Sequence, residues 1–217
     1  MLKLLDSVNA RVSISGRMRM LGVLMILPVA FTGVLLFNSH METVNFAKKE
    51  IDGTKYISGI WPALIAGATD QSLTDTEAAN LEKAATENSH IMAPDKALAL
   101  KSISGEDLLK FAVADISLIT DHSGLVLDPD LDSFYMMDGV AVKLPTLMAE
   151  ARNLYNTRDE PDTEIQHQIY EVTFVNATAE LKDSFEKSGQ YASRKALSPE
   201  TQKALNDLTT ASRAFSD

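Results

Sequence analysis

An apolar stretch without a charged side chain runs from Met20 to Phe37, a length of 18 residues. A helix rises about 1.5 Å per residue, and about 20 residues cross the hydrocarbon core of a bilayer. Pro28 and Gly33 are compatible with such a role because both residue types are tolerated inside membrane helices. The pattern predicts a transmembrane helix over residues 20–37.

Beyond the apolar stretch, hydrophobic residues recur at the three- and four-residue spacings of amphipathic helices. Gly124–Leu127 is the only strand-like segment, and it is too short and solitary to form a sheet. Capping residues and helix-compatible prolines mark the predicted starts. In chain order, the helices are predicted to begin at Met41, the capping box Thr74–Glu77, Ser104, Asp132–Ser133, Asp159–Pro161 and Ser198–Pro199.

The same pattern predicts ends and faces for these helices. Pro94 is expected to end the second helix and Gly189 the fifth, while Pro145 is expected to kink the fourth. In the first helix, residues spaced by seven predict a narrow packing seam, and the seam predicts a weak homodimer. The seam consists of Val44, Ile51, Ser58 and Ile65. Trp61 on the same helix is interpreted as a core residue.

The third helix has an apolar stripe that is expected to face the core of the bundle. It consists of Leu108, Leu109, Ala112, Ile116 and Ile119.

Charge flanks the apolar stretch asymmetrically. Residues 1–19 carry four basic side chains against Asp6 alone, a net charge of +3, and the next basic residue after the stretch is Lys48. The positive-inside rule then predicts that residues 1–19 are cytoplasmic and residues 38–217 exported. We therefore expect a single-pass protein of the inner (cytoplasmic) membrane, all-α, whose N-terminal transmembrane helix continues into an antiparallel periplasmic helical bundle.

Two other interpretations of residues 20–37 are less compatible with the sequence. A signal peptide would have a small-residue cleavage site, which Asn38-Ser39-His40 does not provide. A buried core helix would explain the apolar composition but not the basic residues on one side only. An uncleaved anchor accounts for both features.

The composition excludes several classes of function. The 217 residues contain no cysteine, which removes disulfide scaffolds, thiolate metal sites and cysteine nucleophiles. The whole chain carries a net charge of −10, so residues 38–217 carry −13. Nucleic-acid binding is not expected, because its affinity comes from neutralising phosphates. The four histidines are isolated and no nucleotide-binding or nucleophile-elbow motif occurs, so we expect no enzyme, no cofactor and no metal site.

An acidic turn over Leu127–Asp138 is the densest group of charged residues. Asp128, Asp130 and Asp132 match the first ligand positions of a calcium loop, but the required later Gly and Glu are absent. Acids before a helix also cap its free N–H groups, and the sequence predicts that Asp132 is the cap of a helix that begins near Ser133.

Five residues from two segments are the predicted ligand contacts. The first helix offers a cation and a hydroxyl, and the acidic turn offers two carboxylates and a phenol. Asp138 lies well inside the predicted helix, where the dipole contributes little, so it is expected to have another partner such as Lys55 or Lys143. The five candidates are Lys55, Tyr56, Asp130, Tyr135 and Asp138.

Three segments resemble the sensor regions of bacterial transmembrane chemoreceptors (methyl-accepting chemotaxis proteins): Glu50–Tyr56, Trp61-Pro62 and Leu127–Asp138. Similar regions occur in membrane histidine kinases and diguanylate cyclases. The resemblance implies a homodimer in the bilayer that senses an unidentified small molecule. It also implies a second membrane helix, a HAMP linker and a cytoplasmic region that contacts a kinase complex. None of these lies within the 217 residues, so a fragment is expected.

Two classes of function therefore remain open from the sequence. In the first, a ligand shifts one membrane-connected helix relative to another and biases a two-state output. In the second, the chain is an anchored structural bundle without a small-molecule ligand.

Overall fold

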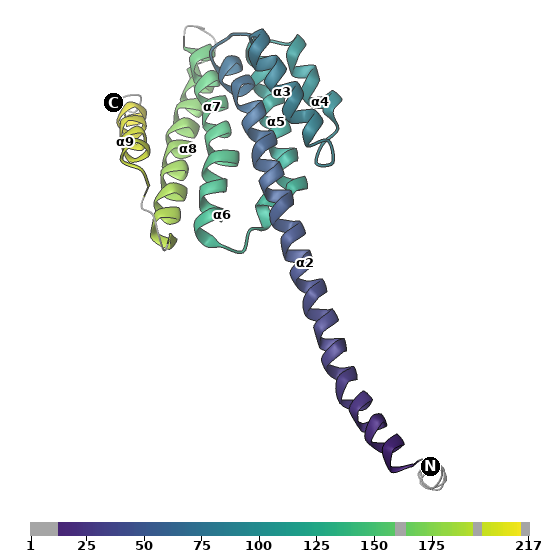
Figure 1. Ribbon diagram of the computed structural model, residues 1–217. Coiled ribbons are helices and arrows are strands. Elements are labelled where there is room, and N and C mark those ends of the chain that lie inside the picture. Colours follow the sequence, from purple (N-terminus) through teal and green to yellow (C-terminus); the bar gives the residue numbers. More distant parts are fainter. Residues whose placement is uncertain (1–12, 159–163, 193–196, 214–217) are drawn as a thin grey trace. The chain divides into compact units, whose positions relative to one another are not determined.

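The computed structural model describes residues 13–158, 164–192 and 197–213, which form helices joined by turns (Figure 1). The predicted all-α class is confirmed, and no strand occurs in these ranges. Residues up to Ala47 and residues from Lys48 onward form two compact units. The elements are α2 (Ile14–Ala68), α3 (Asp75–Glu87), α4 (Pro94–Ala99), η1 (Leu100–Ser102), α5 (Gly105–Ser123), η2 (Leu125–Leu127), α6 (Leu131–Met137), η3 (Asp138–Lys143), α7 (Leu144–Thr157), α8 (Glu164–Tyr191) and α9 (Pro199–Arg213).

The first part of α2 contains the predicted membrane segment. It holds an 18-residue window with a mean hydropathy of 2.5, of which no residue is buried. Among the described helices, α2 is the one long and apolar enough to cross a membrane. Exposed apolar side chains along this segment match a lipid-facing surface, because lipid tails solvate them as well as a protein core would.

The part of α2 after Lys48 packs into the larger core of the second unit. Its buried face contains Tyr56, Ile60 and Leu64, spaced by four residues. Gly67 lets α2 approach α5 closely, since an added Cβ would meet the backbone of Leu109. Trp61 is partly buried against this core, as predicted.

The predicted seam on this helix does not contribute to the core of the chain. Ile51 and Ile65 are each 55% exposed, Val44 is 46% exposed, and Ser58 is exposed. The buried face follows the 3.6-residue period of a single helix packing on its neighbours, whereas the seam follows a seven-residue period and lies on the outer side. Ile51, Ser58 and Ile65 therefore form an exposed stripe on α2, which we call the outer stripe.

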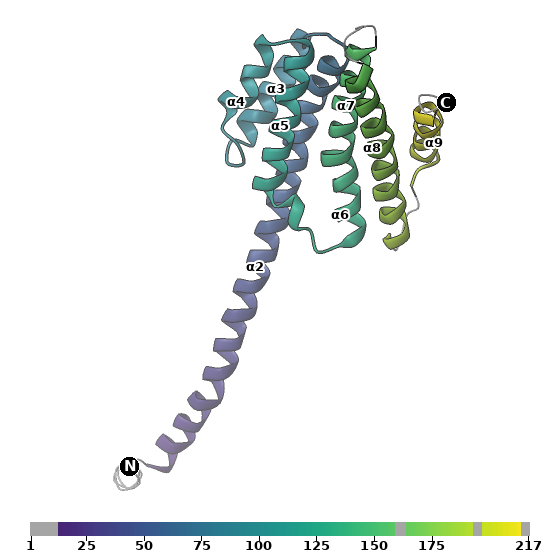
Figure 2. The same cartoon turned by 180° about the vertical axis from the view of Figure 1, so that it is seen from behind.

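Helices α3, α4 and α5 pack around the end of α2 (Figures 1 and 2). The capping box at the start of α3 is confirmed, with Glu77 N donating to Thr74 Oγ1 (3.3 Å) and Thr74 N to Glu77 Oε2 (2.9 Å). All five residues of the predicted stripe on α5 are buried. Gly124 ends α5 in the left-handed conformation (φ 82°), which glycine adopts without steric cost.

The chain between α3 and α6 differs from the prediction at Pro94. Helix α3 ends at Glu87, where the Asn88 side chain donates to the Ala84 carbonyl (2.8 Å). Pro94 then begins α4, because a proline lacks the N–H that a first helical residue leaves unpaired. The strand-like segment Gly124–Leu127 forms no strand, in agreement with the prediction, and contains the 3₁₀ turn η2.

In the unit that begins at Lys48, α8 pairs with the helical segment formed by α6, η3 and α7. Ser188 donates to the Asp132 carbonyl, Ser184 to the Asp138 carboxylate and Lys143 to Glu180. Because the numbers rise on one side as they fall on the other, α8 runs antiparallel to α6, η3 and α7. The second core lies between these helices and α9; it consists of Leu147, Leu154, Phe174, Ala177, Leu181, Phe185 and Leu205.

Pro145 does not break this pair. Its ring would meet the carbonyl of Ala141 in a regular α-helix, and the π-helical η3 stands immediately before it. The wider turn accommodates the proline, so the helix continues from α6 into α7. At the other end, α8 continues past Gly189 to Tyr191, and Gly189 therefore does not end it. The predicted start at Asp159–Pro161 lies outside the described residues, and α8 is described from Glu164.

Candidate ligand site

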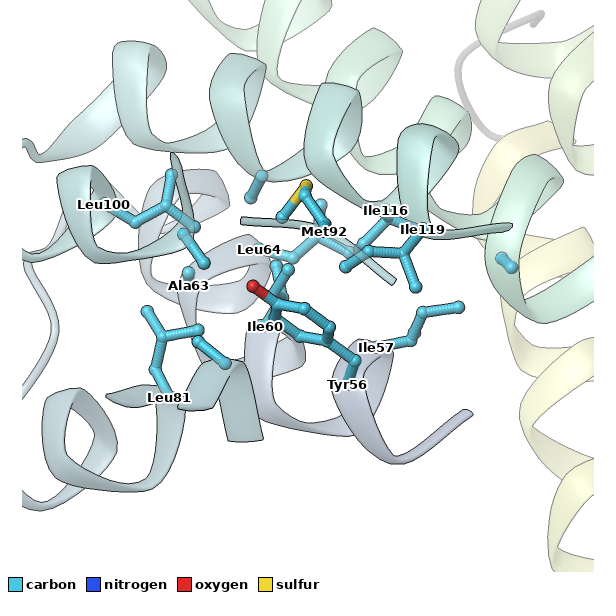
Figure 3. Packing of buried hydrophobic residues seen from close by; sticks show 14 of the residues in the cluster. Tyr56, Ile57, Ile60, Ala63, Leu64, Leu81, Met92, Leu100, Ile116 and Ile119 are labelled. Carbon is cyan, nitrogen blue, oxygen red and sulfur yellow. The ribbon is translucent and has the colours of Figure 1, made fainter. Parts of the chain in front are cut away.

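The two predicted ligand residues on α2 have different environments. Lys55 Nζ forms an exposed ion pair with Asp52 Oδ1 at 3.0 Å. Tyr56 is fully buried, and Figure 3 shows its ring among Ile57, Ile60 and Leu64. Tyr56 thus belongs to the core, whereas Lys55 belongs to the surface.

The other three predicted residues lie on or next to α6. Asp130 is exposed and is the N-cap residue of α6, without a side-chain capping hydrogen bond. The Tyr135 ring stacks on Tyr191 with centroids 5.7 Å apart. Lys187 Nζ lies 5.5 Å from the centroid of the Tyr135 ring, a cation–π contact. Tyr135 is therefore held against the end of α8.

Asp138 has a partner, but not one of the two that we expected. Its Oδ2 accepts a 2.6 Å hydrogen bond from Ser184 Oγ on α8. Lys143 pairs with Glu180 at 2.7 Å, and Lys55 pairs with Asp52. Asp132 is not the cap either: it lies within the first turn of α6, where its Oδ1 accepts from the N–H of Ser133 (3.0 Å). The helix begins two residues earlier than predicted, which moves Asp132 inside it.

A cavity that the sequence analysis did not anticipate lies between η1 and α5. Its volume is about 480 Å³, within the usual range for small-molecule sites. On α5 it is lined by residues at positions i, i+3, i+4 and i+7 of one helical face. These residues are Phe111, Ala114, Asp115 and Leu118; Lys96, Ala99, Leu100, Ser102 and Ile103 complete the wall. We call it the α5 cavity.

Asp115 is the buried charged group of the α5 cavity. It is 8% exposed, and within the described ranges no hydrogen bond or ion pair reaches its carboxylate. Burial raises the pKa of Asp115, and the Lys96 ammonium opposes that shift from the solvent side. An unpaired carboxylate in an apolar wall is unfavourable for folding, so its presence there points to a role other than stability.

Tyr56 lies close enough to this carboxylate to be affected by it. Burial, followed by the negative charges of Asp115 and Asp95, raises the pKa of Tyr56 to about 12. The phenol is therefore neutral at physiological pH, and its buried hydroxyl has no hydrogen-bond partner in the described chain. Tyr56 was predicted to contact a ligand directly. Its side chain is instead buried in the core, where the Asp115 carboxylate of the α5 cavity influences it.

A second cavity of about 620 Å³ lies between α6, α8 and the start of α9. Its polar groups already have partners, since Ser188 donates to the Asp132 carbonyl (2.8 Å) and Ser133 to the Asp130 carbonyl (3.1 Å). It offers apolar contact but no unsatisfied group to orient a ligand. The α5 cavity is therefore the stronger candidate.

The sequence contained a signal for this site. Asp115 stands in the segment Phe111–Ile119, where it is the only charged residue and Ser117 the only other polar one. An acid at such a position is rarely buried without a partner. The predicted stripe on this helix described the neighbouring face, so the cavity face was missed.

Metal binding has no geometric support in the residues that the structure describes, where no three acidic or histidine side chains are grouped to hold an ion. Comparison of the chain with protein-family models, curated proteins and solved structures found no match. The assignment of function therefore depends on the site itself and on the resemblance of the three segments.

Proposed function

We propose that this chain is the membrane-anchoring and ligand-sensing region of a transmembrane chemoreceptor. The observation that carries the proposal is the continuity of α2. One helix contains the membrane-compatible segment and, further along, Tyr56, Ile60 and Leu64, which belong to the same core cluster as Leu100 of the α5 cavity wall. A small change in how these residues pack acts directly on a helix that enters the membrane.

The proposed topology places residues 1–19 in the cytoplasm and residues 38–217 in the periplasm. It is supported by the basic residues before the apolar segment and by the lack of a cleavage site after it. An alkaline phosphatase fusion after residue 60 is active in the periplasm in this topology. An inactive fusion, or recovery of a shortened soluble protein, contradicts it.

Sensing requires that a ligand displace α2 relative to another helix. The absence of cysteine allows two labelling sites to be introduced freely, at Thr54 on α2 and at Asn176 on α8, which are both exposed. Spin labels there report the distance between the two helices in the full chain, in nanodiscs and diluted with unlabelled chain. A panel of amines, carboxylates, alcohols and sugars provides the probes.

A sensor shows a distance change with at least one probe class, together with a rise in Tm. If no probe changes either quantity, the anchored structural bundle is the better description. The sensor region of a histidine kinase or diguanylate cyclase would pass the same test. Fusion of residues 1–217 to the second membrane helix, HAMP linker and signalling region of a chemoreceptor then tests the chemotaxis output, because a probe that acts through this chain changes the swimming response.

A further inference from the structure

The walls of the α5 cavity fit an apolar body. Leu100, Ile103, Phe111 and Leu118 are the large apolar residues of its lining. Phe111 is 54% exposed although it is a large aromatic residue in a folded core helix. An exposed ring at a cavity wall offers a surface on which a ligand can stack or place a cation.

The charged groups of the cavity favour a cation. The lining holds one carboxylate, Asp115, and one ammonium, Lys96, which is the base that acts on Asp115 in the described chain. Asp95, next to Lys96 in the sequence, adds a second negative charge that acts on the Tyr56 hydroxyl as Asp115 does. With Tyr56 neutral, this group contains two acids and one base. A carboxylate ligand would be repelled by Asp115, whereas an ammonium group would give this carboxylate the partner it lacks.

The charge of the surrounding chain acts in the same direction. Residues 38–217 carry a net charge of −13, which raises the local concentration of small cations. Lys96 is exposed, so its side chain can move into solvent when another cation pairs with Asp115.

We infer that the α5 cavity binds a small organic ammonium ion with an apolar body, its ammonium group paired with Asp115 and its body against Phe111 and Leu118. This inference deepens the proposed sensing function and rests on it for its biological role. The binding itself is a property of the cavity and can be measured without a signalling output.

The test uses the full chain in nanodiscs and isothermal titration calorimetry, with empty nanodiscs subtracted. The probes are 2-phenylethylamine, its neutral analogue 2-phenylethanol and the anion phenylacetate. The amine is expected to bind at least about tenfold more tightly than the alcohol, and the anion not to bind, because a hydrogen bond to a charged group is stronger than one between neutral groups.

Variants connect this preference to the site. Asp115→Asn is expected to reduce amine affinity to that of the alcohol, and Ala114→Leu to abolish binding of both by filling the cavity. Lys96→Gln is expected to increase amine affinity. Asp121→Asn changes an exposed acid on the same helix and is expected to leave binding unchanged. Circular dichroism of each variant identifies any that fails to fold.

Three outcomes overturn the inference: equal affinity for amine and alcohol, an unchanged preference in Asp115→Asn, or unchanged binding in Ala114→Leu. The proposed function fails separately. If the amine binds through Asp115 but the distance between the Thr54 and Asn176 labels stays constant, the site is confirmed and sensing is not. If another probe class shifts that distance while the amine does not bind, sensing is supported and the ammonium assignment is wrong.

Discussion

The Ser184 hydroxyl donates a 2.6 Å hydrogen bond to the Asp138 carboxylate and so joins α8 to the π-helical turn η3. Ser184 is 4% exposed, and Gly139, the next residue along η3, lies against the Phe185 ring. The π-turn thus meets α8 at a polar contact beside a close apolar one. The contact explains how a carboxylate is accommodated well inside a helix, where the helix dipole does little for it.

Ser184→Ala is therefore expected to lower the free energy of unfolding by about 1–3 kcal/mol, because it removes a hydrogen bond to a charged acceptor. Asp138→Asn retains an acceptor oxygen and is expected to have a smaller effect. Ser117→Ala, at an exposed position inside α5, is the matched control for helix propensity. Urea denaturation measures all three. An equal effect of the Ser184 and Ser117 variants would show that the contact contributes nothing.

The two predicted helix caps are expected to differ in their contributions. Thr74→Ala removes the hydroxyl of the capping box that accepts from Glu77 N, while the backbone N–H at this position still donates to Glu77, and should lower stability by about 0.5–2 kcal/mol. Asp132→Ala should cost less, because Asp132 lies inside the first turn of α6 and contacts only the adjacent N–H. Thermal denaturation of the two variants ranks them. A larger loss of stability for Asp132→Ala would mean that Asp132 caps the helix, as the sequence suggested.

The outer stripe is the surface of α2 that we expect to meet a second copy of the chain. Its apolar members, Ile51 and Ile65, face away from the core with a heptad spacing that suits a two-helix contact. Single cysteines at Ile51, Ser58 or Ile65 are expected to cross-link between copies in membranes under mild oxidation. A cysteine at Asn80, exposed on α3, provides the control. Equal cross-linking at Asn80 would mean that the stripe has no special role.

Local signals in the sequence were sufficient for the elements that depend on local chemistry. The Thr74–Glu77 capping box and the buried stripe of α5 required only neighbouring residues, and both are confirmed. The buried face of α2 was not predicted, because residues spaced by seven and residues spaced by three or four can both be apolar on one helix. Only the presence of α3 and α5 on one side selects Tyr56 and Ile60 for the core.

The candidate site could not be assembled from the sequence for a related reason. Asp115 was visible as a lone acid in an apolar run, but its significance depends on η1, which closes a cavity opposite it. Pro94 was expected only to end a helix, so the short helix α4 and the turn η1 were not anticipated. Tyr56 was singled out for its hydroxyl, yet its aromatic ring buries a large apolar area, and this favours a position in the core.

The pH dependence of folding gives a test of Asp115 that needs no ligand. Burial raises its folded-state pKa above the unfolded value, so the folded state binds more protons between the two values. Stability therefore falls as pH rises through this window and is restored on acidification. Asp115→Asn removes the charge that must be buried and is expected to raise the free energy of unfolding at pH 7 on the order of 1 kcal/mol.

The diagnostic quantity is the difference between the wild type and Asp115→Asn at each pH. Glu50, whose pKa is also raised by burial, adds a slope of the same sign, and Glu77, whose pKa is lowered by its contacts with Thr74, adds one of opposite sign. Both contributions cancel in the difference. Urea denaturation from pH 4 to pH 8 should show the variant gaining on the wild type as pH rises. A constant difference, or one that shrinks with rising pH, would mean that Asp115 is already paired when the chain is folded.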